Sequence, residues 1–290
     1  MNILILGANG ILGHTLYTFL KNNHKIQLLG LCGKTSKNSK FNQENSSSLI
    51  EIDLKDFSKL ERIIKNFRPD IIVNCAVKKN LSSIDEKIID SIYINSILPH
   101  TIANLSSLYQ FKFIHISTDS VFGNFGKDKS EDSELIMQDL YSASKALGEP
   151  INKNSIILRT SLIGHSLNGD TGLLDWVLKS EVVYGFENHI YAGITSLELS
   201  KIINLILKSD KFISGIYHIS GNQISKYDLV SIIIKNYNLN TILNKTTNEP
   251  LDRSITSIKF EKQFNYNPPN WDSLLKELRI FYLNNKHLYD

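Results

Sequence analysis

Tyr141 and Lys145 are two proton-exchanging side chains placed four residues apart in the sequence. On a helix this spacing puts both side chains on one face. A lysine ammonium beside a phenol favours the phenolate and lowers the pKa of the tyrosine from about 10. A tyrosine with a lowered pKa can act as a general acid or base near neutral pH. Because tyrosine and lysine are both frequent in this chain, the pair needs support from other residues.

That support comes from a hydroxyl group upstream of the pair. Thr118 and Asp119 lie at the end of an apolar segment that we expect to be a strand. Doubly wound folds carry their chemistry at the carboxyl ends of parallel strands. The Thr118 hydroxyl is suited to hold a substrate carbonyl or hydroxyl beside the phenol, and Asn95 is suited to complete a polar relay. We therefore predict Thr118, Tyr141 and Lys145 as catalytic residues.

A glycine-rich turn near the start of the chain predicts a dinucleotide site. It lies between an apolar, strand-like run and an amphipathic helical pattern. Glycine permits the positive φ of a tight strand-to-helix turn, and its missing Cβ lets a pyrophosphate approach the N–H groups at the helix N-terminus. Because strand, turn and helix follow in order, we predict cofactor contacts at six positions. They are Gly7, Asn9, Gly10, Ile11, Leu12 and Gly13.

The segment after the second expected strand favours NADP(H), with NAD(H) as an option. An NAD-binding fold places an acidic residue about 20 residues past the glycines, on the ribose 2′-hydroxyl. Residues 30–37 contain no carboxylate, and Lys34 is suited to face a 2′-phosphate. Asp53 follows the third expected strand, where it is placed to cap the next helix or to meet the adenine edge.

The elements that must position these residues alternate between strand-like and helix-like patterns. This alternation predicts a Rossmann-type, doubly wound parallel sheet covered by helices. We expect a polar loop at Lys34–Ser48. The expected strands are Asn2–Leu6, Lys25–Leu31, Leu49–Ile52, Asp70–Asn74, Phe111–Ser117 and Ser155–Arg159, and the expected helices are 11–21, Asp53–Asn66, 85–109 with a break at Pro99, and 139–149.

Beyond Arg159 the alternation weakens, which favours a smaller, mostly helical and discontinuous C-terminal lobe. Helical patterns cover 195–208, Tyr227–Asn236 and Trp271–Leu283, while Gly215–Ile219 is expected to return to the sheet. We therefore predict a cofactor-binding core of residues 1–160 plus about 194–219, and a substrate lobe of about 161–193 plus 220–290.

The composition excludes several other classes of protein. The 290 residues are 42% hydrophobic and 21% charged, as in ordinary globular proteins. With 32 Lys and Arg against 29 Asp and Glu, the charge is too balanced for a dedicated nucleic-acid binder. No segment is apolar enough to span a membrane, the N-terminus lacks a signal peptide, and the two cysteines have no zinc-site spacing. We expect a cytoplasmic protein with no metal, membrane or nucleic-acid partner; a homodimer is left open.

Together these residues resemble the extended short-chain dehydrogenase/reductase superfamily and, within it, the dTDP-4-dehydrorhamnose reductase family. The resemblance covers almost the whole chain and is specific in the first 165 residues. It is carried by the glycine turn and Tyr141-x-x-x-Lys145, and by Asp53-Leu54, Asn74-Cys75-Ala76, Asn95, Ser117-Thr118-Asp119-Ser120-Val121-Phe122-Gly123, Arg159-Thr160-Ser161 and Asp252-Arg253-Ser254.

The resemblance implies reduction of the 4-keto group of a nucleotide-activated deoxysugar, in the biosynthesis of surface-polysaccharide sugars. NADPH would deliver a hydride to C4, and Tyr141 would protonate the developing alkoxide. Lys145 would bind the nicotinamide ribose and keep Tyr141 acidic, while Thr118 would hydrogen-bond the carbonyl oxygen. The resemblance also implies cofactor contacts at Asp53, Leu54, Cys75, Ala76, Asn95, Tyr141 and Lys145.

Substrate contacts are expected at the end of the fifth strand and in the C-terminal lobe. Arg253 is suited to grip a diphosphate with two donors. Trp176 is suited to stack on the base or sugar, although its apolar run also fits one face of an amphipathic helix. The predicted substrate-binding residues are Thr118, Asp119, Ser120, Trp176 and Arg253. Because Ser120 stands where the family usually has a tyrosine, we expect a sugar related to rhamnose rather than rhamnose itself.

Four other functions have to be weighed against this interpretation. A nucleotide-sugar 4-epimerase needs the same Thr, Tyr and Lys, but it holds NAD tightly, and residues 30–37 lack the acidic residue for NAD. A 4,6-dehydratase needs a glutamate where Ser120 stands. An epimerase-reductase resembling GDP-fucose synthase would pair Cys75 with His165, which are more simply a buried cysteine and a loop histidine. A non-catalytic, NADP-binding regulatory subunit remains an alternative, because fold does not fix function.

Overall fold

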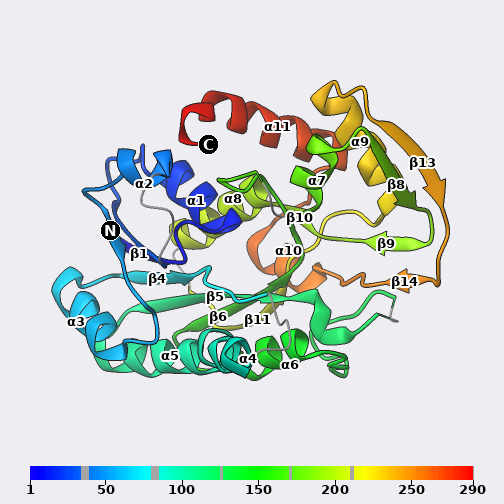
Figure 1. Ribbon diagram of the computed structural model, residues 1–290. Helices are drawn as coiled ribbons and strands as arrows, with labels where there is room; N and C mark the ends of the chain where they lie inside the picture. Colours follow the sequence, from blue (N-terminus) through cyan, green and yellow to red (C-terminus); the bar gives the residue numbers. More distant parts are fainter. Residues whose placement is uncertain (34–38, 80–84, 125–126, 170–171, 210–211, 290) are drawn as a thin grey trace.

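The centre of the protein is a seven-stranded parallel sheet, seen in a computed structural model that describes residues 1–33, 39–79, 85–124, 127–169, 172–209 and 212–289 (Figure 1). Its strand order is β11-β6-β5-β4-β1-β2-β3. The strands are β1 (Asn2–Leu6), β2 (Gln27–Cys32), β3 (Leu49–Glu51), β4 (Ile71–Asn74), β5 (Lys112–Thr118), β6 (Ser155–Thr160) and β11 (Gly215–His218). Because the order reverses between β1 and β4, the predicted doubly wound fold is confirmed.

Helices cover both faces of this sheet (Figure 1). Successive residues of β1 point to opposite faces, so Ile3 and Ile5 enter one apolar core while Leu4 and Leu6 enter the other. One face carries α1 (Ile11–Leu20), α2 (Lys40–Glu44) and α8 (Ser196–Lys208). The opposite face carries α3 (Phe57–Phe67), α4 (Asp85–Ile92), the π-helix η1 (Tyr93–Ile97), α5 (Leu98–Tyr109) and α6 (Leu140–Leu147).

The remaining elements gather beyond the carboxyl ends of the sheet strands (Figure 1). A third apolar core, which includes Val183, Leu229 and Trp271, holds this part together. Its helices are α7 (Leu173–Lys179), α9 (Lys226–Tyr237) and α11 (Trp271–Asn284). Its strands are β7 (Leu162–Ile163) with β10 (Ile194–Thr195), β8 (Val182–Phe186) with β13 (Ile242–Thr246), and β9 (His189–Tyr191) with β12 (Ile224–Ser225) and β14 (Leu251–Asp252). Helices α10 (Ile258–Phe264) and η3 (Lys286–Leu288) pack instead into the core that contains Ile3 and Ile5, through Phe260 and Leu288.

The structure differs from the sequence predictions mainly at short elements. Gly215–His218 joins β6 in the sheet, as predicted. The expected loop at Lys34–Ser48 contains α2, and the lobe contains short strands that the sequence analysis did not predict. These strands are two to five residues long, so they leave little periodicity in the sequence.

Candidate active site

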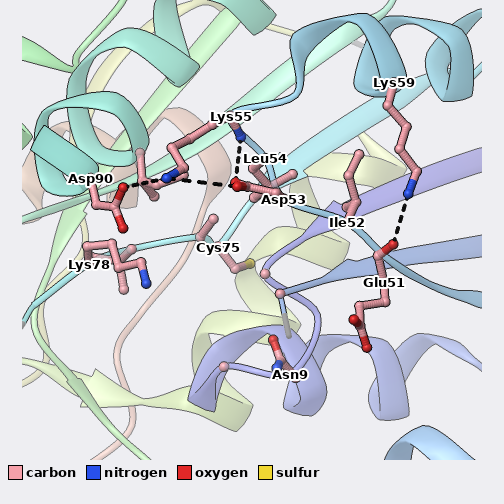
Figure 2. A pocket seen from close by; sticks show the side chains of 16 residues that line it. Asn9, Glu51, Ile52, Asp53, Leu54, Lys55, Lys59, Cys75, Lys78 and Asp90 are labelled. Atoms are coloured by element: carbon pink, nitrogen blue, oxygen red, sulfur yellow. Dashed lines mark hydrogen bonds and ion pairs between the residues drawn. The ribbon is translucent and has the colours of Figure 1, made fainter. Parts of the chain in front are cut away.

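A cavity of about 620 Å³ opens where the strand order reverses, at the carboxyl ends of β1 and β4 (Figure 2). This is the position at which doubly wound sheets bind their ligands. Seven of the predicted cofactor residues line the cavity: Gly7, Asn9, Gly10, Asp53, Leu54, Cys75 and Ala76. The cavity therefore joins residues from the turns after β1, β3 and β4, although they are far apart in the sequence.

The glycine turn has the backbone that a bound pyrophosphate requires. Gly7 adopts φ +72°, and a Cβ at this position would lie 2.7 Å from the backbone of Ala76. A Cβ on Gly13 would lie 2.0 Å from the carbonyl oxygen of Gly7. Helix α1 begins after Gly10, whose N-cap position has no side-chain hydrogen bond within the described chain. The first N–H groups of α1 are therefore available for an anion, and the residues fit a dinucleotide.

The far end of the cavity carries charged side chains that the sequence analysis did not assign. Glu51 pairs in register with Cys32 at the ends of β3 and β2, so its carboxylate reaches the region where an NAD-binding fold has its acidic residue. The residue was missed because it comes from the neighbouring strand rather than from the end of β2. Lys34, predicted to face a 2′-phosphate, lies outside the described residues.

Asp53 lines this end of the cavity but does not cap the next helix, so that prediction was wrong. The side chain of Asp56 accepts from the N–H of Lys59 and is the cap of α3, because α3 begins four residues later than the pattern predicted. Asp53 instead accepts from the N–H of Lys55. The Lys55 ammonium lies 2.6 Å from Asp90 and 3.8 Å from Asp53, so it links the β3–α3 turn to α4 across the cavity (Figure 2).

Cys75 lines the cavity, and Asn95 is a fully buried residue bonded to another lining residue, Lys78. Burial raises the pKa of the Cys75 thiol to about 12, so the thiol is protonated at neutral pH and is not an acid–base group. Asn95, in the π-helix η1, pairs with both backbone groups of Lys78 at 2.9 Å and donates to the Ser144 hydroxyl at 3.0 Å. Asn95 therefore joins the cavity wall to α6. Its hydrogen bonds in this structure are to Lys78 and Ser144, and the polar relay predicted for it stays a prediction.

Thr118, Asp119 and Tyr141 come together at the carboxyl end of β5. The Thr118 hydroxyl donates to Asp119 at 3.2 Å and lies 3.2 Å from the Ser120 hydroxyl. A capping box of Asp139 and Ser142 starts α6, which places Tyr141 in the first turn of this helix. Burial raises the pKa of Tyr141 to about 12, a contact with Thr118 works against burial, and the Asp119 carboxylate adds to the increase.

This pKa corrects the expectation that Lys145 makes Tyr141 acidic. The Lys145 side chain turns toward the sheet, where its Nζ donates to the carbonyl of Ile116 at 2.7 Å and lies 3.3 Å from Nε2 of His115. Burial lowers the pKa of Lys145 to about 8. The spacing of four places both residues on one face of α6, but Lys145 is not among the influences on the Tyr141 pKa, which are burial, the contact with Thr118 and the carboxylates of Asp119 and Asp139.

The C-terminal part brings Arg253 to the same region. Its Nε donates to Asn124 at 2.9 Å, which fixes the guanidinium. Burial raises the pKa of Asp119, and the charge of Arg253 works against that increase. Lys226 is half-buried at the start of α9, and this burial lowers its pKa. The charge of Arg253 lowers the pKa further, and the Asp119 carboxylate raises it. Lys226 could not be recognised from the sequence, because β12 and α9 bring it here from a distant segment.

Other candidate residues lie apart from this group. Trp176, on α7, has 44% of its surface exposed, and within the described chain no hydrogen bond or ring contact joins it to Thr118 or Arg253. His165 stacks on Tyr282 with 4.0 Å between ring centroids and bonds the Tyr237 hydroxyl, and no contact among the described residues joins it to Cys75. Among the described residues, no group of His, Cys, Asp and Glu is arranged to hold a metal ion. No described helix has the length and apolar character needed to cross a membrane.

Comparison with known protein families gives one match that spans nearly the whole chain. The model of the RmlD substrate binding domain matches residues 1–279. The dTDP-4-dehydrorhamnose reductase of Aggregatibacter actinomycetemcomitans is 24% identical over 96% of this chain and 98% of its own length. The methionine adenosyltransferase 2 subunit beta of Xenopus tropicalis is 26% identical over 86% of this chain and 76% of its own length.

Solved structures have the same fold. A hypothetical dTDP-4-dehydrorhamnose reductase from Sulfolobus tokodaii superposes with a TM-score of 0.77 at 25% identity, covering 94% of this chain and 98% of that one. The dTDP-4-dehydrorhamnose reductase of Bacillus anthracis, in complex with NADP, superposes with a TM-score of 0.76 at 23% identity, covering 96% and 98%.

Proposed function

Because this chain belongs to the family of the RmlD substrate binding domain, we propose that it reduces the 4-keto group of a nucleotide-activated deoxysugar with NADPH. The predicted class, an NAD(P)H-dependent oxidoreductase, is confirmed by this family and its reductase relatives. The finer assignment rests on one observation: Thr118, Asp119 and Tyr141 meet at the end of β5, next to β4, whose end lines the dinucleotide cavity.

The protonation state of Tyr141 suits a reduction. A pKa of about 12 keeps the phenol protonated at neutral pH in the unliganded chain. When a hydride reaches C4, the carbonyl oxygen becomes an alkoxide that is far more basic than a phenolate, so the phenol can give up its proton. The Thr118 hydroxyl then holds the same oxygen, as a donor preorganised at the end of β5.

Cationic side chains support a diphosphate-linked sugar. The positive charge of Arg253 lowers the pKa of Lys226, so the two cations are close enough to repel each other. The Asp119 carboxylate interacts with both and balances part of their charge. Lys226 is half-buried at the N-terminus of α9, where the helix dipole disfavours a cation. An anionic substrate group between Arg253 and Lys226 would reduce both the repulsion between the two cations and the unfavourable interaction of Lys226 with the helix dipole. A diphosphate has the required charge, and Arg253 can bind it with two donors.

The glycine cradle supports a dinucleotide, and the NADP complex of the Bacillus anthracis relative supports NADPH as the form used. The cofactor supplies the hydride; the chain binds it and supplies the proton. We also propose that the protein is cytoplasmic, because NADPH and nucleotide sugars are both cytoplasmic metabolites.

The proposal is tested by incubating the full chain with NADPH and a panel of 4-keto nucleotide sugars, followed by product identification by NMR. We expect NADPH oxidation with at least one sugar, and a new C4 hydroxyl in its product. The Tyr141→Phe variant serves as the matched control, because it should bind NADPH but form no product. Epimerised substrate without net NADPH oxidation would contradict the reductase assignment.

A second function, a non-catalytic binding subunit, is favoured by the similarity to a methionine adenosyltransferase subunit. The same experiment separates the two. NADPH binding without oxidation across the whole panel would favour the binding subunit, whereas turnover that depends on Tyr141 would exclude it.

A further inference from the structure

His115 lies directly behind Lys145, on the inner side of the candidate active site. It belongs to β5 and is fully buried. Its Nε2 lies 3.3 Å from Nζ of Lys145, and its Nδ1 lies 3.1 Å from the amide nitrogen of Asn74. An imidazole in this position is not required by the proposed reaction, so its contacts need a separate explanation.

The hydrogen bonds determine which ring nitrogen carries the proton. The backbone N–H of Ala76 can only donate, and it donates to Oδ1 of Asn74 at 3.1 Å. The other end of the Asn74 amide, Nδ2, therefore faces His115 and donates to Nδ1. Since Nδ1 is an acceptor, a neutral His115 carries its proton on Nε2. Burial, followed by the charge of Lys145, lowers the pKa of His115 well below its ordinary value, so the ring is neutral.

The Nε2–H of His115 thus points at Nζ of Lys145. An ammonium has three donors and no acceptor, so it meets this N–H unfavourably, whereas a neutral amine can accept the hydrogen bond. The Lys145 nitrogen also donates to Ile116, and a neutral amine has the hydrogens to keep that bond. The contacts on both sides of Nζ are therefore satisfied by the amine.

We propose that His115 is a positioning residue for Lys145, and that the hydrogen bond from its Nε2–H stabilises the neutral amine relative to the ammonium. The consequence for catalysis rests on the proposed function: the more His115 favours the amine, the smaller the positive charge that Lys145 presents to the cofactor and substrate at neutral pH.

Other charged and titratable groups face these two residues. Burial is the largest influence on the pKa of Lys145; the Glu149 carboxylate favours the ammonium, and the charge of Lys79 opposes it. The Glu149 carboxylate already binds Arg159 at 2.7 Å and accepts from Ser117 at 2.5 Å, so part of its charge is balanced. Among the described residues, His100 also acts on the pKa of His115, which it lowers.

The test is an NMR titration of the full, unliganded chain with isotope-labelled lysine side chains, in which the Lys145→Met variant identifies the signal. We expect Lys145 to titrate near pH 8 in the natural chain. His115→Phe should move this titration upward by about one pKa unit or more, because the donor is removed. His115→Gln should keep it within about half a unit, because the glutamine amide can donate from the same place.

His100→Gln is the matched control, because His100 bonds the carbonyl of Leu147 and does not contact Lys145. An unchanged titration in His115→Phe, or an equal shift in His115→Phe and His115→Gln, would overturn the proposal. A second measurement needs no variant: the ¹⁵N spectrum of the natural chain should show His115 protonated on Nε2, and a proton on Nδ1 would contradict it. None of these readouts needs a substrate, so their outcome is independent of whether the proposed reduction occurs.

Discussion

The cofactor cavity and the sugar end of the site are built by different means. In the cavity, recognition depends on backbone: Gly7 and Gly13 leave no room for a Cβ, and the first N–H groups of α1 are free to bind an anion. At the sugar end, recognition depends on side chains that meet from distant elements, such as Tyr141 from α6 and Arg253 from the segment after β14. A substitution in the cofactor cavity should therefore weaken binding by adding a side chain that does not fit. A substitution at the sugar end should weaken binding or catalysis by removing a charge or a proton donor.

The largest effect should come from the side-chain half of this comparison. Tyr141→Phe removes the proton donor without changing ring shape, and we expect kcat to fall by about 10²- to 10⁴-fold. NADPH affinity, measured by fluorescence titration, should stay within about twofold of the natural chain, because the glycine cradle is untouched. A variant that retains full kcat would remove Tyr141 as the donor.

The backbone half should fail next, through added volume. Gly13→Ala places a Cβ 2.0 Å from the Gly7 carbonyl oxygen, so the turn must shift. Overpacking of this kind costs about 1–3 kcal/mol, and we expect NADPH affinity and the free energy of unfolding to fall together. Gly33→Ala is the control, since a Cβ there meets no atom within 4 Å although Gly33 lines the same cavity. Equal losses in both variants would contradict the steric explanation.

A change of charge at the sugar end should affect the substrate alone. Arg253→Gln removes a charged hydrogen-bonding group, and such groups contribute about 1.5–3 kcal/mol. We expect the KM for the nucleotide sugar to rise by about 10- to 150-fold while NADPH affinity is kept. Arg62, exposed on α3, provides the control variant Arg62→Gln. If Arg253→Gln weakens NADPH binding instead, the cofactor cavity and the sugar end of the site are not independent.

The smallest effect should sharpen the comparison at a charged side chain within the cofactor cavity. Glu51 lies at the end of β3 beside Cys32 and lines the cavity. We expect its carboxylate to repel the 2′-phosphate of a bound NADPH. Glu51→Gln should improve NADPH binding relative to NADH by about two- to fivefold, as expected for a solvent-accessible charge. Glu187→Gln, in the distant β8–β9 turn, should leave the ratio of the two affinities unchanged.

The features that the sequence could predict are those formed by neighbours in the chain. The glycine turn needs only residues 2 to 20, and the sequence analysis placed β1 without error. Tyr141 and Thr118 were recognised by spacing and by position after a strand. Glu51, His115 and Lys226 were missed because each acts through a partner on another element: Cys32, Lys145 and Arg253 respectively.

Helix boundaries and pKa values failed for related reasons. The start of α3 depends on whether Asp53 or Asp56 caps it, and both residue types suit the position. The pKa of Tyr141 depends on burial, which the spacing of Tyr141 and Lys145 does not contain. The sequence pattern therefore identified the residues that could exchange protons, but it did not predict whether their surroundings raise or lower their pKa values.

The contact between α6 and the π-helix η1 has a consequence for how the protein opens. A Cβ on Gly148 would lie 1.8 Å from the carbonyl oxygen of Asn95, so the two backbones touch, and Asn95 and Ser96 each bond Ser144. Local unfolding of α6 would have to break this seam and expose η1 as well. Amide hydrogen exchange at the two segments should therefore follow a single opening event, so the helix that carries Tyr141 and Lys145 should exchange its amides at the same rate as η1.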